Sequence, residues 1–329
     1  MSFTCMHVKK YGFLYALFLS VLAGLKSPDF GVNLSHQFGL SLTHLAIWLI
    51  FLRQGLALPS EDLLRGRHPI RLHAFVLSWN FLIFPLVTAA LVLSAGLWIG
   101  PDLQLGFYLL SILPTTIASA IALTAASGGN TAKAIFSTVY SNLLAVFWVP
   151  IAGLFFLGIS SGSQISLLPV ISQLGLLIAL PLLIGQLTQH ILPKFAVTVS
   201  SKTTWLCPGL ILWLVYNAFA KSTQSGGFDQ LTPTQLITTV LCSALLLLLV
   251  SGMVWWSQRW LQIEKDCRPA AFFCASQKSL ATGLPLLATL LAGSGLAEIP
   301  AILYVPILVY HSLQLLLGSV LLRFFEKLD

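Results

Sequence analysis

The sequence predicts an all-α polytopic membrane protein with ten transmembrane helices in two inverted five-helix repeats. Hydrophobic residues make up 57% of the 329 residues and charged residues only 8%, and the mean hydropathy is +0.90. A soluble domain of ordinary composition has about 25% charged residues. Apolar runs near the ~20 residues needed to cross a ~30 Å hydrocarbon layer recur along the chain. We therefore expect a multi-pass protein of the lipid bilayer with no appended soluble domain.

Ten apolar runs define the expected spans. The first, residues 11–25, follows a basic segment, and residues 21–23 resemble a weak signal-peptide cleavage site. Because more membrane segments follow, we expect an uncleaved helix. Short polar or Gly/Pro-bearing links separate the other nine runs, which cover residues 38–58, 72–99, 105–127, 131–158, 165–191, 203–221, 233–260, 270–292 and 298–325.

The basic residues favour this count and predict a cell membrane protein with both termini in the cytoplasm. With that orientation the outer loops hold only Lys26 and Lys221, while Arg53 and Lys278 lie inside or at the edge of spans. Such a bias is the positive-inside pattern, so the net charge of +7 indicates topology and no nucleic-acid partner. The remaining 13 of the 17 basic residues fall on the inner side: Lys9, Lys10, Arg65, Arg67, Arg71, Lys133, Lys194, Lys202, Arg259, Lys265, Arg268, Arg323 and Lys327.

Ten spans divide at residues 160–163 into spans 1–5 (residues 1–159) and spans 6–10 (residues 160–329). An odd number of spans in each half gives the halves opposite orientations, a common plan of secondary transporters. The fourth span of each half carries a polar break, at residues 114–124 and at residues 277–285. The similarity between the two breaks depends on their positions in the fourth span of each half, on their small residues and on a proline in each.

Lys278 lies near the middle of the apolar run 270–292, where a charge is costly. Ser276, Gln277, Ser279 and Pro285 surround it, and such residues suit a helix that opens locally. One interpretation is an ion or substrate site in a broken helix, in which Lys278 stands as a fixed ammonium or exchanges a proton. The other is a lysine that snorkels from a helix end or is paired inside the bundle.

Further polar residues inside the spans are candidate ligands. Sodium takes oxygen ligands of this kind, although serine and threonine often only bond to the preceding helical turn. His311 and Gln314 lie on one face of the last span, three residues apart, after Pro306. A single histidine here is a hydrogen-bonded structural group more often than a metal ligand. The oxygen-bearing candidates are Ser119, Thr124, Ser276, Gln277 and Ser279.

Other chemistries find little support in the sequence. The five cysteines are scattered without CxxC spacing, so they indicate neither a disulfide framework nor a zinc site. Hydrolase, metalloprotease and P-loop motifs are absent, and we place all ten carboxylates in loops or at span edges. The sequence therefore predicts no enzyme and no cofactor other than a coupling Na⁺.

Three stretches resemble the SBF-like branch of the bile acid:sodium symporter family. They are the run from Leu113 to Phe136 with its Gly-Gly-Asn, the run Phe273–Leu286 with Gln-Lys-Ser-Leu, and the run Val305–Val320 with Tyr-His-x-x-Gln. The resemblance extends over nearly the whole chain. It implies a panel domain from spans 1, 2, 6 and 7, a core domain from spans 3–5 and 8–10, and crossed, discontinuous fourth and ninth helices.

The same resemblance implies a set of sodium ligands with clear departures. Ser119 and Thr138 match ligand positions of one sodium site, and Gln277 matches the other. Ala120 stands in place of an asparagine ligand, Phe273 in place of a glutamate shared by both sites, and Lys278 in place of an asparagine. A lysine in place of a sodium ion is the physical alternative to sodium coupling.

Two classes of function follow from these features. The first is a secondary active transporter of a small anionic organic solute, working by alternating access and coupled to Na⁺ or H⁺. The second is a membrane regulator of calcium homeostasis that transports nothing. A passive channel ranks third, because no charged ring or carbonyl filter motif is repeated.

Overall fold

The structure is a computed structural model that describes residues 3–29, 42–57, 68–96, 98–161, 172, 175–226, 228, 231–293 and 301–325. These residues are helical with short connections, and no strand occurs among them. They divide into two compact units. Unit 1 is Met1–Ala57, Gly175–Gln230 and Leu296–Ile302, and unit 2 is Leu58–Leu174, Leu231–Gly295 and Leu303–Asp329.

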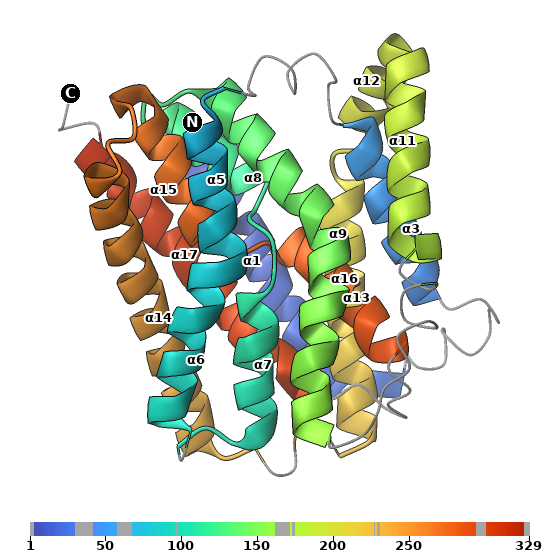
Figure 1. The fold of residues 1–329 in the computed structure, drawn as a ribbon. Helices are drawn as coiled ribbons and strands as arrows, with labels where there is room; N and C mark the ends of the chain where they lie inside the picture. The colour runs from blue at the N-terminus through green and yellow to red at the C-terminus, as the bar shows by residue number, and fades with distance from the viewer. Residues whose placement is uncertain are drawn as a thin grey trace. The chain divides into compact units, whose positions relative to one another are not determined.

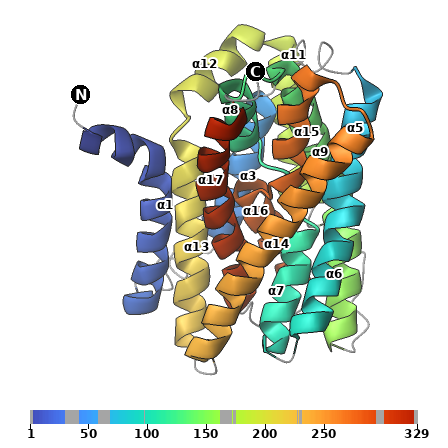
Figure 2. The same cartoon turned by 90° about the vertical axis from the view of Figure 1, so that its left-hand side faces the viewer.

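Unit 1 is built from pairs of closely packed helices. Helix α3 (Leu42–Leu56) packs along α11 (Leu180–Ile191), which continues the π-helix η2 (Gly175–Ala179). Helix α1 (Phe3–Lys26) lies alongside α13 (Leu206–Gln224), as Figure 2 shows. The short α12 (Pro193–Lys202) precedes α13 and makes an angle of 53° with it.

Two glycines bring α3 and α11 together. A Cβ added to Gly185 would collide with the Leu52 carbonyl oxygen and lie 2.9 Å from the Gly55 Cα. Gln186 Nε2 also donates to the Gly55 carbonyl oxygen at 2.7 Å. Without a strong hydrophobic force between helices in lipid, small residues allow the close backbone packing that holds membrane helices together.

Unit 2 holds the longer helices and the interrupted ones (Figure 1). One continuous path consists of α5 (Ile70–Ser78), the π-helix η1 (Trp79–Ile83) and α6 (Phe84–Ala95). Helices α9 (Thr131–Ser161), α14 (Pro233–Trp260) and α17 (Val305–Phe325) pack around it. A capping box between Thr232 and Gln235, with Pro233 as the first helical residue, fixes the start of α14. The remaining pieces are α7 (Pro101–Ser111), α8 (Ala118–Ala126), η3 (Lys265–Cys267), α15 (Arg268–Ser276) and α16 (Leu280–Gly293).

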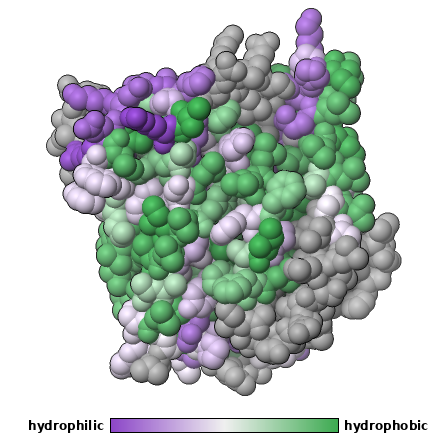
Figure 3. Space-filling view, viewed as in Figure 1, coloured by the Kyte–Doolittle hydropathy of each residue, from purple (hydrophilic) through white to green (hydrophobic). Residues whose placement is uncertain are grey.

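Four continuous helical stretches of the described residues are long and apolar enough to cross a membrane. These are Ile70–Ala95, Thr131–Phe156, Pro233–Trp260 and Ala301–Gly318, and the bent pair α12–α13 would be a fifth. Figure 3 shows hydrophobic side chains over the middle of α6, α7 and α9 in unit 2, with hydrophilic ones gathered where α5 and α15 begin. The exposed Trp256 and Trp260 at the end of α14 suit a membrane–water interface.

The expected spans match these helices unevenly. The eighth coincides with α14, whereas the fourth and ninth are each interrupted, as their polar residues predicted. Helix α12 was not predicted, because residues 192–202 were expected to form only a link between the sixth and seventh spans. Residues 38–41, 58, 97, 165–171, 173–174 and 298–300 of the expected spans lie outside the described residues, as do residues 162–163 of the dividing segment 160–163. The total of ten spans stays a prediction.

Replacing Gly185 by valine should destabilise unit 1. The added Cβ meets backbone atoms of α3, which no side-chain rotation can move, and overpacking of this kind costs about 1–3 kcal/mol or more. We expect a lower midpoint of thermal unfolding in detergent, measured by fluorescence-detected size exclusion. Gly209→Ala in α13 is the matched control, since a Cβ there meets no atom within 4 Å. An unchanged midpoint for Gly185→Val would contradict this packing.

Candidate functional site

Two helix breaks in unit 2 face each other. The first is residues 112–117 between α7 and α8, and the second is Gln277–Ser279 between α15 and α16. Pro114 lies in the first break, and Gln277 has an extended backbone in the second. The Ser279 backbone N–H donates to the Pro114 carbonyl oxygen at 2.7 Å, so each break satisfies part of the other's backbone.

Helix α17 satisfies the rest of the second break. The side-chain amide of Gln314 accepts from the Lys278 N–H and donates to the Lys278 carbonyl, both at 2.8 Å. Its Nε2 also lies 2.8 Å from His311 Nδ1, which acts as the acceptor. The Tyr310 hydroxyl donates to the Ser276 carbonyl oxygen at 2.8 Å. A buried backbone without such partners would be costly, so these three side chains stabilise the open helix.

The Lys278 ammonium is held by three backbone carbonyls. Nζ donates to the carbonyl oxygens of Asn80 at 2.9 Å, Ser111 at 2.7 Å and Leu113 at 2.8 Å. It also lies 4.1 Å from the centroid of the Phe84 ring, a cation–π contact. The residue is only 1% exposed. All three ammonium donors are therefore used inside the protein, and the interpretation of a snorkelling lysine is wrong.

Each of these three carbonyls lacks a backbone N–H partner in its own helix, and the reason is local. In the π-helix the Asn80 carbonyl would bond the N–H five residues on, and that residue is Pro85, which has none. Ser111 ends α7 and Leu113 lies in the break, so neither carbonyl continues a helical ladder. The ammonium also lies at the negative C-terminal end of α7, which favours a positive charge.

Gln277 places its side chain against the first break. Its Oε1 lies 2.8 Å from Thr116 Oγ1 and 2.9 Å from Ser119 Oγ, and the two hydroxyl oxygens are 2.6 Å apart. Ser119 is on the first turn of α8, so the amide ties α8 to the second break. These three oxygens are a compact polar group beside the backbone of Lys278.

The structure brings together some of the predicted site residues and leaves others aside. Lys278, Gln277, Ser119, His311 and Gln314 meet at the breaks, and Ser279 joins them through its backbone N–H while its hydroxyl caps α16 by accepting from the Thr282 N–H. Ser276 contributes its backbone carbonyl, which accepts from Tyr310, but its hydroxyl and those of Thr138 and Thr124 bond within their own helices or lack a described partner. Thr138 donates to the Ile135 carbonyl and Ser276 to the Phe272 carbonyl, and the buried Thr124 hydroxyl has no hydrogen-bond partner among the described residues.

Sequence analysis missed several contributors because they act through backbone atoms or a ring. Asn80, Ser111 and Leu113 offer carbonyls, which no side-chain pattern reveals. The only available signal was Pro85, which leaves an acceptor without its donor. The Asn80 side chain also joins two helices, because its Nδ2 donates to the Cys274 carbonyl oxygen of α15 at 3.1 Å.

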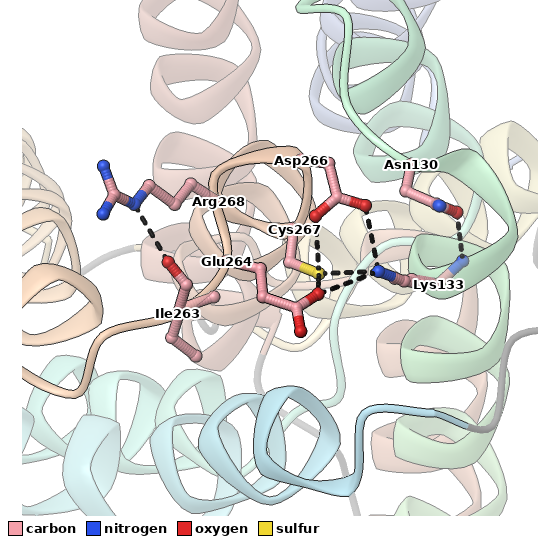
Figure 4. Close-up of polar contacts among 7 residues, drawn as sticks. All are labelled: Asn130, Lys133, Ile263, Glu264, Asp266, Cys267 and Arg268. Atoms are coloured by element: carbon pink, nitrogen blue, oxygen red, sulfur yellow. Dashed lines mark hydrogen bonds and ion pairs between the residues drawn. The ribbon is translucent and has the colours of Figure 1, made fainter.

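A second polar cluster lies at one end of unit 2, where η3 meets α9 (Figure 4). Lys133 Nζ is 2.9 Å from Asp266 Oδ2, 3.4 Å from Glu264 Oε2 and 3.0 Å from Cys267 Sγ. The hydrogen bond from Lys133 holds the pKa of Asp266 below its ordinary value. Burial raises the pKa of the Cys267 thiol to about 11. Lys133 contacts both carboxylates and the thiol, so the cluster is an ion-paired clamp between η3 and α9.

The site and fold together define a multi-pass membrane protein whose interrupted helices meet around a buried cation, an arrangement typical of secondary transporters. The chain belongs to the SBF-like CPA transporter family, whose sequence model matches residues 11–327.

Similar proteins include the "Putative symporter YfeH" of Escherichia coli K12, 31% identical over 291 residues, which are 87% of this chain and 85% of the relative. "Sodium/bile acid cotransporter 7" of Mus musculus is 28% identical over 326 residues, 95% of this chain and 92% of the relative. An uncharacterized protein of Pseudomonas aeruginosa is 31% identical over 288 residues, 87% of this chain and 84% of the relative. The family and these names support a transporter.

Gln314→Leu should destabilise unit 2. The change leaves the buried Lys278 N–H without its partner and removes the 2.8 Å hydrogen bond to the Lys278 carbonyl, which keeps the longer 3.4 Å contact with His311 Nδ1. At about 1–3 kcal/mol for the N–H and about 1 kcal/mol for the lost bond, the free energy of unfolding should fall by ~2–4 kcal/mol. Denaturant titration in mixed micelles measures it. Ser312→Ala on the same helix is the control, because the one hydrogen bond of that hydroxyl within the described part of the chain goes to the Leu308 carbonyl of its own helix. Equal losses for the two variants would contradict the bracing role of Gln314.

The Lys133–Asp266 pair should give a small pH-dependent term in stability. Because the folded pKa of Asp266 is depressed, its contribution is present above the unfolded pKa and is lost as pH falls through the folded pKa. Asp266→Asn should lower the unfolding midpoint slightly near pH 7, by the equivalent of less than about 1 kcal/mol because the carboxylate is half exposed.

The difference between wild type and Asp266→Asn should vanish in acid below the folded pKa, and it should shrink in high salt. Thermal unfolding from pH 3 to pH 7, with and without added NaCl, is the measurement. A difference that grows as the pH falls would show that the ion pair has the opposite role.

Proposed function

We propose that this protein is a secondary active transporter of a small organic anion, working by alternating access with its site at the two facing breaks. The observation that carries the proposal is the Lys278 ammonium, enclosed where the two interrupted helices touch. An intramembrane charge is costly, so its presence is by default a mark of function.

The sign of the charge supports an anion as the solute. The hydrogen-bond partners of the ammonium are carbonyl dipoles with no net charge, so the site keeps one positive charge. Helices α8 and α16 begin at the breaks, and helix N-termini favour anions. At an effective dielectric constant of ~20, a charge about 6 Å away contributes roughly 3 kcal/mol to the binding of an anion.

The three-carbonyl cage supports the idea that the Lys278 ammonium is a tethered substitute for a bound cation. Carbonyl oxygens are hard ligands of the kind that an alkali cation takes. Ser119 and Gln277 remain close enough to contribute to a sodium site, with Thr138 as the third residue that the family resemblance implies. The coupling ion in this proposal is Na⁺ or H⁺, and the experiment below separates the two.

The division into two units supports movement of one unit against the other. Unit 1 contains the helices of expected spans 1, 2, 6 and 7, the proposed panel, and unit 2 those of spans 3–5 and 8–10, the proposed core. We propose ten spans in inverted repeats, in the cell membrane, with both termini in the cytoplasm.

A thermal-shift screen with small mono- and dicarboxylates, sulfonates and taurocholate should find anions that raise the wild-type unfolding midpoint. Neutral amide analogues should not do so. Replacing Lys278 by methionine shortens the unbranched side chain by one atom and removes the charge. The apparent affinity for the anions should then fall by about a hundredfold, the equivalent of ~3 kcal/mol.

The screen is run with and without Na⁺ at pH 6 and pH 8, and uptake of the best ligand into proteoliposomes then identifies the coupling ion. Lys278→Arg shows whether a charge alone suffices, and Lys221→Met controls for loss of an exposed lysine. Size-exclusion profiles confirm that each variant is folded. Equal binding and uptake by wild type and Lys278→Met, or no response to any anion, would overturn the proposal.

A further inference from the structure

Helix α12 in unit 1 is a short amphipathic helix with its own exposed surface, which no part of the proposed transport mechanism uses. It runs at 53° to α13, across the end of that helix (Figure 2). Ala196 and Ser200 are buried on one face of α12 and pack towards α3 and α11. On α3, Arg53 donates to the Ser200 carbonyl oxygen at 3.0 Å, which fixes the helix in place.

The outward side of α12 is basic and has apolar edges. Lys194, Thr198, Ser201 and Lys202 are exposed on it. Phe195 (56% exposed) and Val197 (55%) lie on its two flanks, and Trp205 (70%) follows in the turn to α13. Exposed rings beside lysines suit a membrane interface, where the rings can reach the acyl boundary and the lysines stay among the headgroups.

The charged side chains of α11, α12 and α13 have one sign. Between Asp102 and Asp229 the sequence holds no aspartate or glutamate, so every charged side chain on these three helices is basic. Their exposed lysines attract anions, and aromatic rings beside them favour the interface over bulk water.

We propose that the α12 surface, consisting of Lys194, Phe195, Lys202 and Trp205, docks anionic phospholipid headgroups. The two ammonium groups contact the phosphates, and the two rings insert beside the first acyl carbons. A Lys or Arg near an anionic membrane surface contributes about 1 kcal/mol, a factor of about five in affinity, so the pair contributes roughly 25-fold. An acidic protein or free phosphate would use the lysines and leave the rings in water.

The test titrates the purified full-length protein in neutral detergent with phosphatidylglycerol or phosphatidylcholine, and reads the unfolding midpoint and the lipids retained in native mass spectrometry. Phosphatidylglycerol should raise the wild-type midpoint and remain bound. Lys194→Gln with Lys202→Gln should weaken its apparent affinity by roughly 10–30-fold. The double variant should match wild type in phosphatidylcholine.

Lys26→Gln with Lys221→Gln is the matched control, because those two exposed lysines belong to the same unit but to the last turns of α1 and α13. It should keep the full response to phosphatidylglycerol. Trp205→Ala should reduce retention without removing a charge. An equal response from the two double variants, or equal stabilisation by inorganic phosphate or polyglutamate, would overturn the lipid assignment.

Discussion

The contact on which unit 2 depends is the set of three hydrogen bonds from the Lys278 ammonium to backbone carbonyls. A charge out of water is tolerated only where fixed dipoles replace the lost hydration. Here the dipoles come from a π-helix, from the end of α7 and from the break that follows it. Each of those features leaves carbonyls unpaired in the absence of the lysine. The interrupted helices and the buried charge therefore stabilise each other.

The same requirement explains why the second break needs α17. Opening a helix frees N–H and carbonyl groups that lipid cannot satisfy. The Gln314 amide pairs with both backbone groups of Lys278, and the Tyr310 hydroxyl pairs with the Ser276 carbonyl. In unit 1, α3 and α11 approach closely over Gly55 and Gly185, and the Gln186 side chain adds a hydrogen bond to the Gly55 carbonyl. One unit thus provides a polar, interrupted centre and the other a set of closely packed helices.

Much of this could be predicted from the sequence, because the relevant signals are properties of single residues. The apolar runs gave the helical class, and the serines, glutamine and prolines beside Lys278 gave the position of a break. Gln314 and His311 were found because polar residues three apart share a helix face. The cage was not predictable, since it consists of backbone carbonyls whose freedom depends on the π-helix before Pro85. Thr138 and Ser276 were predicted as lining, yet their hydroxyls bond to the preceding turn. Helix α12 was missed because it is short and only moderately apolar.

The central claim is that the Lys278 ammonium, which belongs to the second break, is buried and bonded to backbone carbonyls at the first break and in the π-helix. An electron cryo-microscopy map of the protein in lipid nanodiscs, at a resolution that shows side chains, tests it most directly. The account predicts continuous density from Lys278 to the carbonyls of Asn80, Ser111 and Leu113, with both helices interrupted at that level. A continuous helix through residue 278, with the lysine extended to the aqueous boundary, would contradict it.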